Sequence, residues 1–552
     1  MTRLGQAAAV VGAAVLQSGG AAAQGEAVYA DGLWQGLGQA ATYALGWLAV
    51  VLAVLYGLVK LSVFRRLYWR ETGALQCPVA ASEQEADVIV IGAGVVGSAL
   101  AHTLGGSLGK KVLLLERDLS EPNRIVGELL QPGGVEALAR LGLLGCIEGI
   151  DAPRTSGYVV FNGAEQVLLD YEEICHWDPR AGAVEENARK ARGAAFHHGR
   201  FVQKLRKAAM AAPGVTAVEA TVQQLVEREN TAGGKSVVGV QYKAAGELRT
   251  ALAPLVVACD GVNSKFRRQL VDSKPKAESS FVGLVLDHCE LPQPDRGHVI
   301  LVDPSPILAY PISSTEARIL VDIPHPLPSA SNGDLERYMR EFVCPQLPAK
   351  MQPSLVAALD SKQLRSMPCS RLHPEFKQQP GLLLLGDSFN MRHPLTGAGM
   401  TVGLSDVLSL RSILGALPSF QDQGRVQDAL QELYRQRTVY SCTLNSLAQA
   451  LYGVFSTHEP VMAYMREACF GYFKLGSVAV SGPISMLSCL RTSPFLLIAH
   501  FVAVALYSVL LTLFPIPWPS RVVRFIHIAI AATKLLVPLL WYEHLLPFVL
   551  NC

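Results

Sequence analysis

Three short motifs, spread over most of the chain, carry residue types that suit the binding of a dinucleotide cofactor. They are Asp-Val-Ile-Val-Ile-Gly-Ala-Gly-Val-Val-Gly at 87–97, Ala-Cys-Asp-Gly at 258–261, and Leu-Gly-Asp-Ser-Phe-Asn at 385–390. Glycines let a backbone approach a phosphate closely, and aspartate oxygens accept hydrogen bonds from hydroxyl groups. Because one elongated cofactor must be held at several places, the order of the motifs indicates a flavin-binding architecture.

The first motif has the form of a strand, a tight turn and the start of a helix. Residues 87–91 are a short apolar stretch, and a helical pattern begins directly after Gly97. Between them, Gly92, Gly94 and Gly97 allow the approach of a pyrophosphate, whose charge the helix N-terminus stabilises. A second apolar stretch ends in Glu116, roughly 20 residues past the turn, where the dinucleotide fingerprint has an acid. Glu116 is expected to hold the adenosine ribose, so the site suits FAD or NAD rather than NADP.

The other two motifs also follow apolar stretches. Asp260 and Gly261 alone are compatible with an ordinary turn, but the Ser-x-x-Arg extension at 264–267 is expected where the chain returns to the dinucleotide sheet. In the third motif, the carboxylate of Asp387 could accept hydrogen bonds from ribityl hydroxyls. The glycine-rich stretch 397–399 then opens a helix, whose dipole would stabilise the negative charge of a reduced flavin.

The composition argues against some partners and sites. With 48 basic and 46 acidic residues among 552, the chain has no charge excess that would predict binding to nucleic acid. The eleven cysteines are scattered without a CxxC pair or a zinc spacing, so no metal site is predicted. Most of the thiols are expected to be buried and free, which favours a reducing compartment for the catalytic body.

Half of the residues are hydrophobic, and the excess is concentrated at the two ends. Residues 1–24 resemble either a signal peptide or a low-complexity tail. The uncharged run 32–59 precedes basic residues and either crosses the membrane, which places the rest in the cytosol, or re-enters it. Near the C-terminus, the apolar stretches 495–514 and 522–550 predict helices that lie in the membrane or, alternatively, a hairpin packed on the protein.

The chain is long for a single core, so two domains with appendages are expected. Strand-like alternation at 237–242 and 318–323 predicts a second sheet in the middle of the chain. Five segments are therefore predicted: an N-terminal membrane-associated segment with a linker at 1–85, a first FAD-binding part with interleaved substrate-domain strands at 86–275, a substrate-binding domain at 276–380, a second FAD-binding part at 381–455, and a C-terminal helical membrane-anchoring region at 456–552.

Two segments resemble the squalene monooxygenase (squalene epoxidase) family of flavoprotein monooxygenases. They are 117–134, with Arg-Ile-Val-Gly-Glu at 124–128, and Asn-Met-Arg-His-Pro-Leu-Thr-Gly at 390–397. The likeness covers residues 86–552, and the N-terminus is poorly matched. It implies an α/β fold with a Rossmann-type FAD-binding domain. An inserted mixed β-sheet substrate domain, similar to that of para-hydroxybenzoate hydroxylase, and C-terminal membrane-associated helices complete the implied architecture.

The resemblance also implies which residues bind FAD and which act in the reaction. Tyr158 and Asp387 would be the catalytic residues, and the Tyr158 phenol would orient the flavin. From the residues alone, an alternative is that Tyr158 is a core tyrosine bonded to a backbone carbonyl. Leu129 stands where the family has an aromatic residue, and Ala398 where it has a glycine. The implied FAD-binding residues are Gly92, Gly94, Val95, Val96, Gly97, Glu116, Arg117, Arg124, Leu129, Arg206, Val222, Asp387 and Met400.

Three histidines near these motifs have simpler interpretations. His197 and His198 are adjacent and would point to different sides of an extended segment, which argues against a metal-binding pair. His393 precedes Pro394 and is expected to be a structural hydrogen bonder rather than a base.

The implied reaction is the FAD-dependent epoxidation of squalene to (S)-2,3-oxidosqualene with O2, an early step of sterol biosynthesis. The electrons come from NADPH, either by transient binding or from a partner, and the resemblance implies NADPH-cytochrome P450 reductase. A flavin C4a-hydroperoxide would transfer oxygen to the alkene in a pocket that excludes water. Apolar side chains for this pocket are available at Phe281, Leu284, Leu286, Leu308 and Tyr310.

The resemblance places the enzyme in the endoplasmic reticulum membrane, in contact with membrane lipid, with its catalytic domain facing the cytosol. Scaffold alone does not choose a substrate, so other functions stay open. A membrane isoprenoid reductase and a ring hydroxylase of quinone type use the same scaffold. A further alternative is a lipid-responsive membrane protein that keeps FAD only as a structural core.

Overall fold

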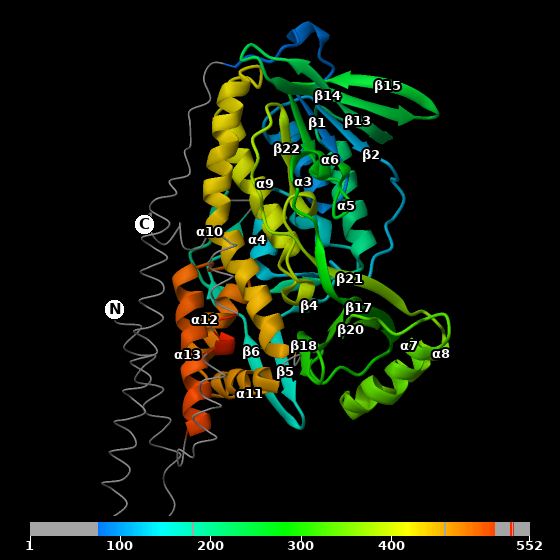
Figure 1. Ribbon diagram of the computed structural model, residues 1–552, viewed down its shortest axis with the longest axis vertical. Helices are drawn as coiled ribbons and strands as arrows, with labels where there is room; N and C mark the ends of the chain where they lie inside the picture. Colours follow the sequence, from blue (N-terminus) through cyan, green and yellow to red (C-terminus); the bar gives the residue numbers. More distant parts are fainter. Residues whose placement is uncertain (1–74, 179–181, 457–459, 514–529, 533, 535–552) are drawn as a thin grey trace, which may run out of the picture.

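The computed structural model describes residues 75–178, 182–456, 460–513, 530–532 and 534 (Figure 1). The predicted segments at 1–24 and 32–59, and most of the apolar stretch 522–550, lie outside the described residues. In Figure 1 the dinucleotide-binding part occupies the upper half of the molecule, and a larger mixed sheet lies below it.

A five-stranded parallel sheet forms the centre of the dinucleotide-binding part. Its strands lie in the order β12-β2-β1-β16-β22, and every neighbouring pair is parallel. Parallel strands are usually buried on both faces, which explains why most of these sequences are continuous apolar runs. The strands are β1 Val88–Ile91, β2 Val112–Glu116, β12 Val215–Glu219, β16 Leu255–Ala258 and β22 Leu382–Leu384.

The two faces of this sheet are covered by different elements, because successive side chains of a strand alternate between faces. Val88 and Val90 of β1 face a core to which five α-helices of the described residues contribute. Ile89 and Ile91 face a second core, shared with a three-stranded antiparallel sheet. The helices are α3 Val95–His102, α4 Pro132–Arg140, α5 His198–Ala211, α9 Gly399–Gly415 and α10 Gln423–Phe455, and the antiparallel strands are β13 Thr221–Glu229, β14 Lys235–Ala244 and β15 Glu247–Leu252.

A seven-stranded mixed sheet, in the order β21-β17-β20-β19-β18-β5-β6, forms the second part. Its neighbouring strands are antiparallel except β18 and β5, which are parallel. Ile319 and Val321 face a core covered by α7 and α8, whereas Leu308 and Leu320 face a core that includes Leu129, Leu395 and the C-terminal helices. The elements are β5 Gly157–Asn162, β6 Glu165–Asp170, β17 Lys276–Asp287, β18 Arg296–Leu301, β19 Ile307–Pro311, β20 Glu316–Pro324, β21 Arg365–Arg371, α7 Asp334–Tyr338 and α8 Gln352–Asp360.

Short elements connect the two large sheets. A small antiparallel sheet in the order β3-β11-β4 lies between them, and two short strand pairs, β7 with β10 and β8 with β9, form an arm on one side. The remaining short elements are β3 Leu129–Leu130, β4 Arg154–Thr155, β7 Glu173–Ile174, β8 Trp177–Asp178, β9 Ala183–Val184, β10 Arg189–Lys190, β11 Gly193–Ala195, α4 Pro132–Arg140 and α6 Lys265–Leu270.

This architecture confirms the predicted fold class, a parallel dinucleotide-binding sheet with an inserted mixed sheet. Two of the mixed sheet's strands, β5 and β6, come from the segment 86–275, where interleaved substrate-domain strands are predicted. The other five come from 276–380. The predicted domain boundaries themselves stay predictions.

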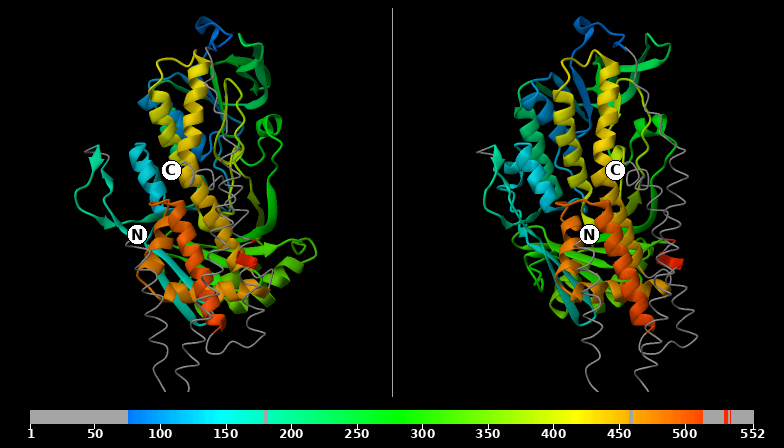
Figure 2. Two further views of the ribbon diagram at one scale, coloured as in Figure 1. Left: turned by 60° about the vertical axis from the view of Figure 1, so that its left-hand side comes forward. Right: turned by 90° about the vertical axis from the view of Figure 1, so that its left-hand side faces the viewer.

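Within residues 416–513, four α-helices follow α9 and pack mainly beside the mixed sheet. They are α10 Gln423–Phe455, α11 Pro460–Lys474, α12 Val478–Leu487 and α13 Pro494–Leu513. The long α10 runs past both sheets (Figures 1 and 2). Residues Pro494–Leu511 of α13 are long and apolar enough to cross a membrane, with a mean hydropathy of 2.2, but 39% of this stretch is buried inside the protein. A core helix of a soluble protein passes the same test, so this is weak evidence for membrane contact.

Replacing Leu100 by alanine is expected to destabilise the fold by about 2–5 kcal/mol, because the cavity left by a buried leucine is only partly filled. Leu100 lies in α3 and is fully buried against the parallel sheet. Leu248→Ala in β15, where the leucine is 63% exposed, is the control and should change stability by less than about 0.5 kcal/mol. Thermal unfolding of the full chain measures both, and equal shifts would contradict the assigned core.

Candidate functional site

The glycine turn lies at the carboxyl end of β1, directly before α3. A Cβ on Gly92, which has a φ of +98°, would lie 2.6 Å from the carbonyl oxygen of Cys259, and a Cβ on Gly97 would lie 1.9 Å from that of Gly92. The chain's own packing therefore requires glycine at both positions. Gly94 differs, because a Cβ there would meet no atom within 4 Å. The space beside Gly94 is open and lies at the start of α3, where a pyrophosphate would be stabilised.

Glu116 and Arg206 hold this turn in shape. Glu116 ends β2, and its Oε2 accepts a hydrogen bond from the amide of Ala93 at 2.6 Å. The buried Arg206 of α5 donates from Nε to the Ala93 carbonyl and from Nη1 to the Ser120 carbonyl, each at 2.8 Å. Its Nη2 lies 3.8 Å from the Glu116 carboxylate. Both predicted residues therefore lie at the turn, and the structure shows them bonded to its backbone.

Asp387 lies beside the same turn, at the carboxyl end of β22. It is exposed, in a short 3-10 turn Gly386–Ser388, and its carboxylate has no hydrogen-bonding partner among the described residues. A Cβ on the preceding Gly386 would lie 3.2 Å from Val96 of α3, so the first and third motifs are in contact. An unpaired carboxylate in this place can accept hydrogen bonds from a polyol, which is the chemistry expected at the ribityl chain.

Arg267 connects the second motif with the third and was not predicted as a site residue. It is 1% exposed, and its guanidinium donates to the carbonyls of Asp387 and Ser388 at 3.3 Å and to that of Val262 at 2.6 Å. Ser264 caps its helix, α6, by accepting from the Arg267 amide at 3.1 Å. The Ser-x-x-Arg spacing in the sequence could have predicted the helix cap made by Ser264. The same spacing does not predict the contact of Arg267 with the Asp387 carbonyl.

Tyr158 lies on the mixed sheet but is linked through a second unpredicted residue, Gln131, to the segment 385–399, which holds the third motif and its glycine-rich continuation and is called the flavin motif below. The Gln131 amide nitrogen donates to the Tyr158 hydroxyl and, at 2.8 Å, to the carbonyl of Thr396, and its oxygen accepts from Tyr171 at 2.9 Å. Burial raises the pKa of Tyr158 to about 12. The partner of Tyr158 is therefore a side chain, not the backbone carbonyl of the alternative interpretation.

An apolar core surrounds Tyr158 on the side of the mixed sheet that faces the flavin motif. It includes Phe281, Leu308 and Tyr310, three of the apolar residues that the sequence makes available for a pocket. The other two, Leu284 and Leu286, face α7 and α8 on the other side of the sheet. The reason is the alternation of strand side chains: Phe281 and Leu284 are three positions apart in β17, so their side chains lie on opposite faces.

The remaining predicted FAD contacts lie in several different places. Arg117 and Arg124 are exposed, and Leu129 is buried in the core around Tyr158. Met400 is half-buried in the first turn of α9. Val222 is buried in β13, in the core on the other face of the parallel sheet, and its carbonyl accepts a hydrogen bond from Lys265. Their contacts with FAD stay predictions.

A buried group of Asp322, Cys369 and His393 brings possible metal ligands within 4.8 Å of one another. The Leu395 amide donates to Nδ1 of His393 at 3.3 Å, so the neutral ring carries its proton on Nε2. A histidine that binds metal through Nε2 instead donates from its other nitrogen. His393 is a structural hydrogen bonder here, as expected from the sequence, and Ser279 donates to Asp322 at 2.5 Å within the same group.

The contrast between Gly94 and Gly97 gives a direct test of the pyrophosphate position. Gly94→Ala is expected to leave the thermal stability of the FAD-free protein unchanged, because the new Cβ meets no protein atom. It should weaken FAD binding at least ~10-fold, or about 1.4 kcal/mol, by filling the open space. Gly97→Ala should destabilise the FAD-free protein, because its Cβ meets the Gly92 carbonyl. Thermal unfolding and flavin fluorescence titration measure the two effects; unchanged FAD affinity in Gly94→Ala would contradict the assignment.

The buried His198 predicts a pH dependence of stability. Its Nδ1 contacts the Gly127 carbonyl at 2.9 Å, and burial lowers its pKa to about 4, from about 6.5 in an exposed histidine. Between these values the unfolded chain binds a proton that the folded chain does not, so the free energy of unfolding should fall by up to about 3 kcal/mol as the pH drops through this range. His198→Asn keeps an N–H donor without titrating.

Chemical unfolding at pH 7 and pH 5 should therefore show a smaller loss of stability in His198→Asn than in the unchanged protein. The exposed His288→Asn is the control and should behave like the unchanged protein. The same loss in all three proteins would show that His198 does not cause the pH dependence.

Comparison with known proteins agrees with this geometry. The chain is similar to Squalene epoxidase 1 of Arabidopsis thaliana, with 44% identity over 461 residues that cover 83% of this chain and 84% of that protein. It is similar to squalene monooxygenase of Mus musculus, with 42% identity over 82% of this chain and 76% of that protein. The solved structure of p-nitrophenol 4-monooxygenase PnpA from Pseudomonas putida shares the fold, with a TM-score of 0.59 and 19% identity over 73% of this chain and 97% of that one.

A family model described as squalene epoxidase matches residues 252–526, which include the second and third motifs and most of the mixed sheet. Together with the extent of the likeness to the relatives, this match shows that the chain belongs to the squalene epoxidase family.

Proposed function

We propose that the protein catalyses the FAD-dependent epoxidation of squalene to 2,3-oxidosqualene with O2. Membership of the squalene epoxidase family supports both the cofactor and the substrate. The observation that carries the proposal is the position of Gln131, which donates to Thr396 in the flavin motif and to Tyr158 on the mixed sheet. The apolar core around Tyr158 therefore lies directly beside the flavin motif, where an alkene would have to be held.

The residues at the edge of the parallel sheet fit FAD. The open space beside Gly94 suits a pyrophosphate, and the carboxylate of Asp387 suits the ribityl hydroxyls. Glu116 and Arg206 keep the turn between them in shape. When bound, the reduced flavin activates O2 and supplies one oxygen atom to the substrate.

The chain's own side chains position the substrate and exclude water. Phe281 and Leu308 line the core beside the flavin motif and are almost fully buried. Because burial raises the pKa of Tyr158 to about 12, its hydroxyl keeps its proton throughout the physiological range. Exclusion of water matters because activated oxygen is otherwise released as H2O2.

We infer that the electrons come from NADPH through NADPH-cytochrome P450 reductase. The sequence contains one Rossmann-type glycine motif, and its acid, Glu116, suits FAD rather than the 2′-phosphate of NADPH. We also infer membrane association, with lipid contact and a location at the endoplasmic reticulum facing the cytosol. The support is the apolar character of α13 and the insolubility of squalene in water, which makes a membrane its source.

The proposed reaction is tested with the full chain purified in detergent and supplied with FAD, NADPH, the reductase, squalene and 18O2. We expect a product with one labelled oxygen at a terminal double bond, identified by mass spectrometry. Asp387→Asn, which removes the charge but keeps the shape, should lower the FAD content and the epoxide yield together. NADPH consumption that yields only H2O2 and intact squalene would exclude this substrate, and a saturated or phenolic product from an isoprenoid or a quinone would favour the corresponding alternative.

A further inference from the structure

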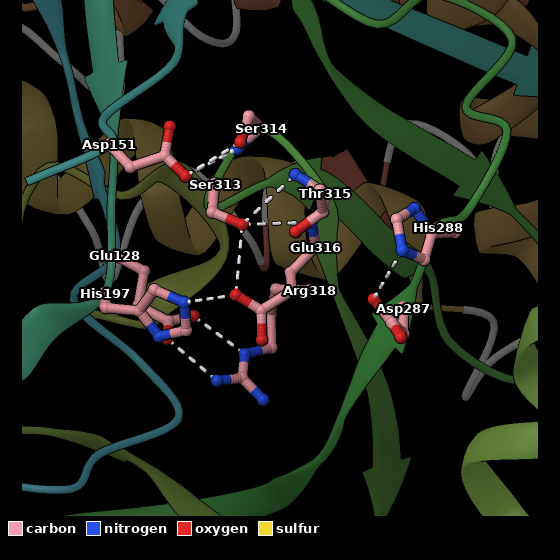
Figure 3. A network of polar contacts seen from close by, with 10 residues as sticks. All are labelled: Glu128, Asp151, His197, Asp287, His288, Ser313, Ser314, Thr315, Glu316 and Arg318. Atoms are coloured by element: carbon pink, nitrogen blue, oxygen red, sulfur yellow. Dashed lines mark hydrogen bonds and ion pairs between the residues drawn. The ribbon is translucent and has the colours of Figure 1, made fainter.

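A buried ion pair joins Glu128 to Arg318 (Figure 3). Nε of Arg318 donates to Oε2 of Glu128 at 2.7 Å, and Nη2 donates to Oε1 at 2.8 Å. Only 1% of the Glu128 side chain and 7% of the Arg318 side chain are exposed. Two parallel N–H···O bonds of this kind fix both the distance and the orientation of the two groups.

The two partners belong to the two parts that have to meet at the site. Glu128 precedes Leu129 and lies in the segment 124–131, which carries two predicted flavin contacts and ends at Gln131. Arg318 lies in β20 directly opposite Tyr310 of β19, so both side chains project from the same face of the mixed sheet. The Tyr310 hydroxyl is also 3.5 Å from Oε2 of Glu128. The ion pair therefore connects the flavin-contacting segment with the substrate sheet.

Both ends of the ion pair are held by further contacts. On the flavin side, the Glu128 carbonyl accepts from the Phe196 amide at 2.8 Å, and the neighbouring Gly127 carbonyl accepts from His198. On the sheet side, Glu316 of β20 accepts from Ser313 at 3.0 Å. Glu316 also pairs at 2.8 Å with His197, which directly precedes α5, so a second, more exposed contact joins the two sides, as Figure 3 shows. The pair thus lies between two braced elements and not at the end of a free loop.

Stability is a poor explanation for such a pair. Removing two charges from water costs much of the free energy that their attraction contributes. Replacing both partners of a buried pair with apolar residues is therefore often neutral or stabilising. Apolar residues in the same places make no directional hydrogen bonds, so they do not fix the distance and orientation of the two elements. A shift of about 1 Å between reacting groups can cost on the order of 100-fold in rate, so a fixed distance has direct value for the reaction.

We propose that Glu128 and Arg318 are positioning residues, which hold the flavin-contacting segment at a fixed distance from the substrate sheet and so couple oxygen use to epoxide formation. This inference rests on the proposed function. When the distance relaxes, the alkene is displaced from the oxygen that has been activated on the cofactor. That oxygen then leaves as H2O2, with the electrons of NADPH, and the alkene stays unreacted.

The test replaces the pair by apolar residues of similar size, Glu128→Leu with Arg318→Met, in the full chain. The matched control is Asp406→Leu with Arg437→Met, because Arg437 of α10 and Asp406 of α9 form an equally buried two-bond pair. Each replacement also leaves one tyrosine hydroxyl, Tyr310 or Tyr440, without its carboxylate. The two double variants therefore remove the same kind of pair at different places, and the control also removes the contact of Arg437 with the ring of Phe389.

We expect the Glu128–Arg318 double variant to keep its thermal stability and FAD content but to form at least ~10-fold less epoxide per NADPH, with H2O2 making up the difference. Hydrogen–deuterium exchange, which needs no turnover, should rise in the peptide 124–131. The control should keep the epoxide yield per NADPH and the exchange of that peptide.

A normal epoxide yield in the Glu128–Arg318 variant, or an equal loss in the control, would overturn the proposal. So would a loss of epoxide that merely follows a loss of FAD. Failure of the unchanged protein to form any epoxide would instead reject the proposed reaction, and unchanged exchange in 124–131 would then reject the positioning role separately.

Discussion

The close approach of backbones at the carboxyl ends of β1, β16 and β22 is the constraint on which the rest of the site depends. At Gly92 and Gly97 the chain passes so near to other carbonyl groups that a single Cβ atom could not be placed. This contact brings the three motifs to one edge of the parallel sheet. It also starts α3 where its N–H groups face the open space beside Gly94, so the anion site is a result of packing as well as of composition.

Away from this edge, a few long-range polar contacts hold segments that lack regular hydrogen bonding. Arg267 holds the turn that carries Asp387, Arg206 holds the glycine turn, and Gln131 holds the segment around Thr396. Each of these side chains is buried, and each donates to backbone carbonyls that no strand or helix satisfies. The site is therefore assembled from loops whose shapes are set by side chains that arrive from other elements.

The local part of this arrangement could be predicted from the sequence. The spacing of Gly92, Gly94, Gly97 and Glu116 contains the whole strand-turn-helix-strand unit, and the parallel sheet follows from it. The distant contacts could not be predicted, because nothing near Arg267 in the chain indicates that it reaches Asp387. The period of two in β17 determines that Phe281 and Leu284 lie on opposite faces, but which face meets the flavin motif is decided by the packing of the two parts.

The shared amide of Gln131 has a thermodynamic consequence. The Gln131 nitrogen donates both to the carbonyl of Thr396 and to the hydroxyl of Tyr158. The flavin motif and the mixed sheet therefore cannot shift independently without breaking one of these bonds. Binding of the cofactor at the flavin motif is then linked to the order of the mixed sheet, and binding of the substrate at the mixed sheet is linked to the order of the flavin motif. Such linkage is reciprocal. The factor by which bound cofactor changes the affinity for the hydrocarbon equals the factor by which bound hydrocarbon changes the affinity for the cofactor. The affinity of an enzyme built in this way for its flavin would change with the supply of its substrate.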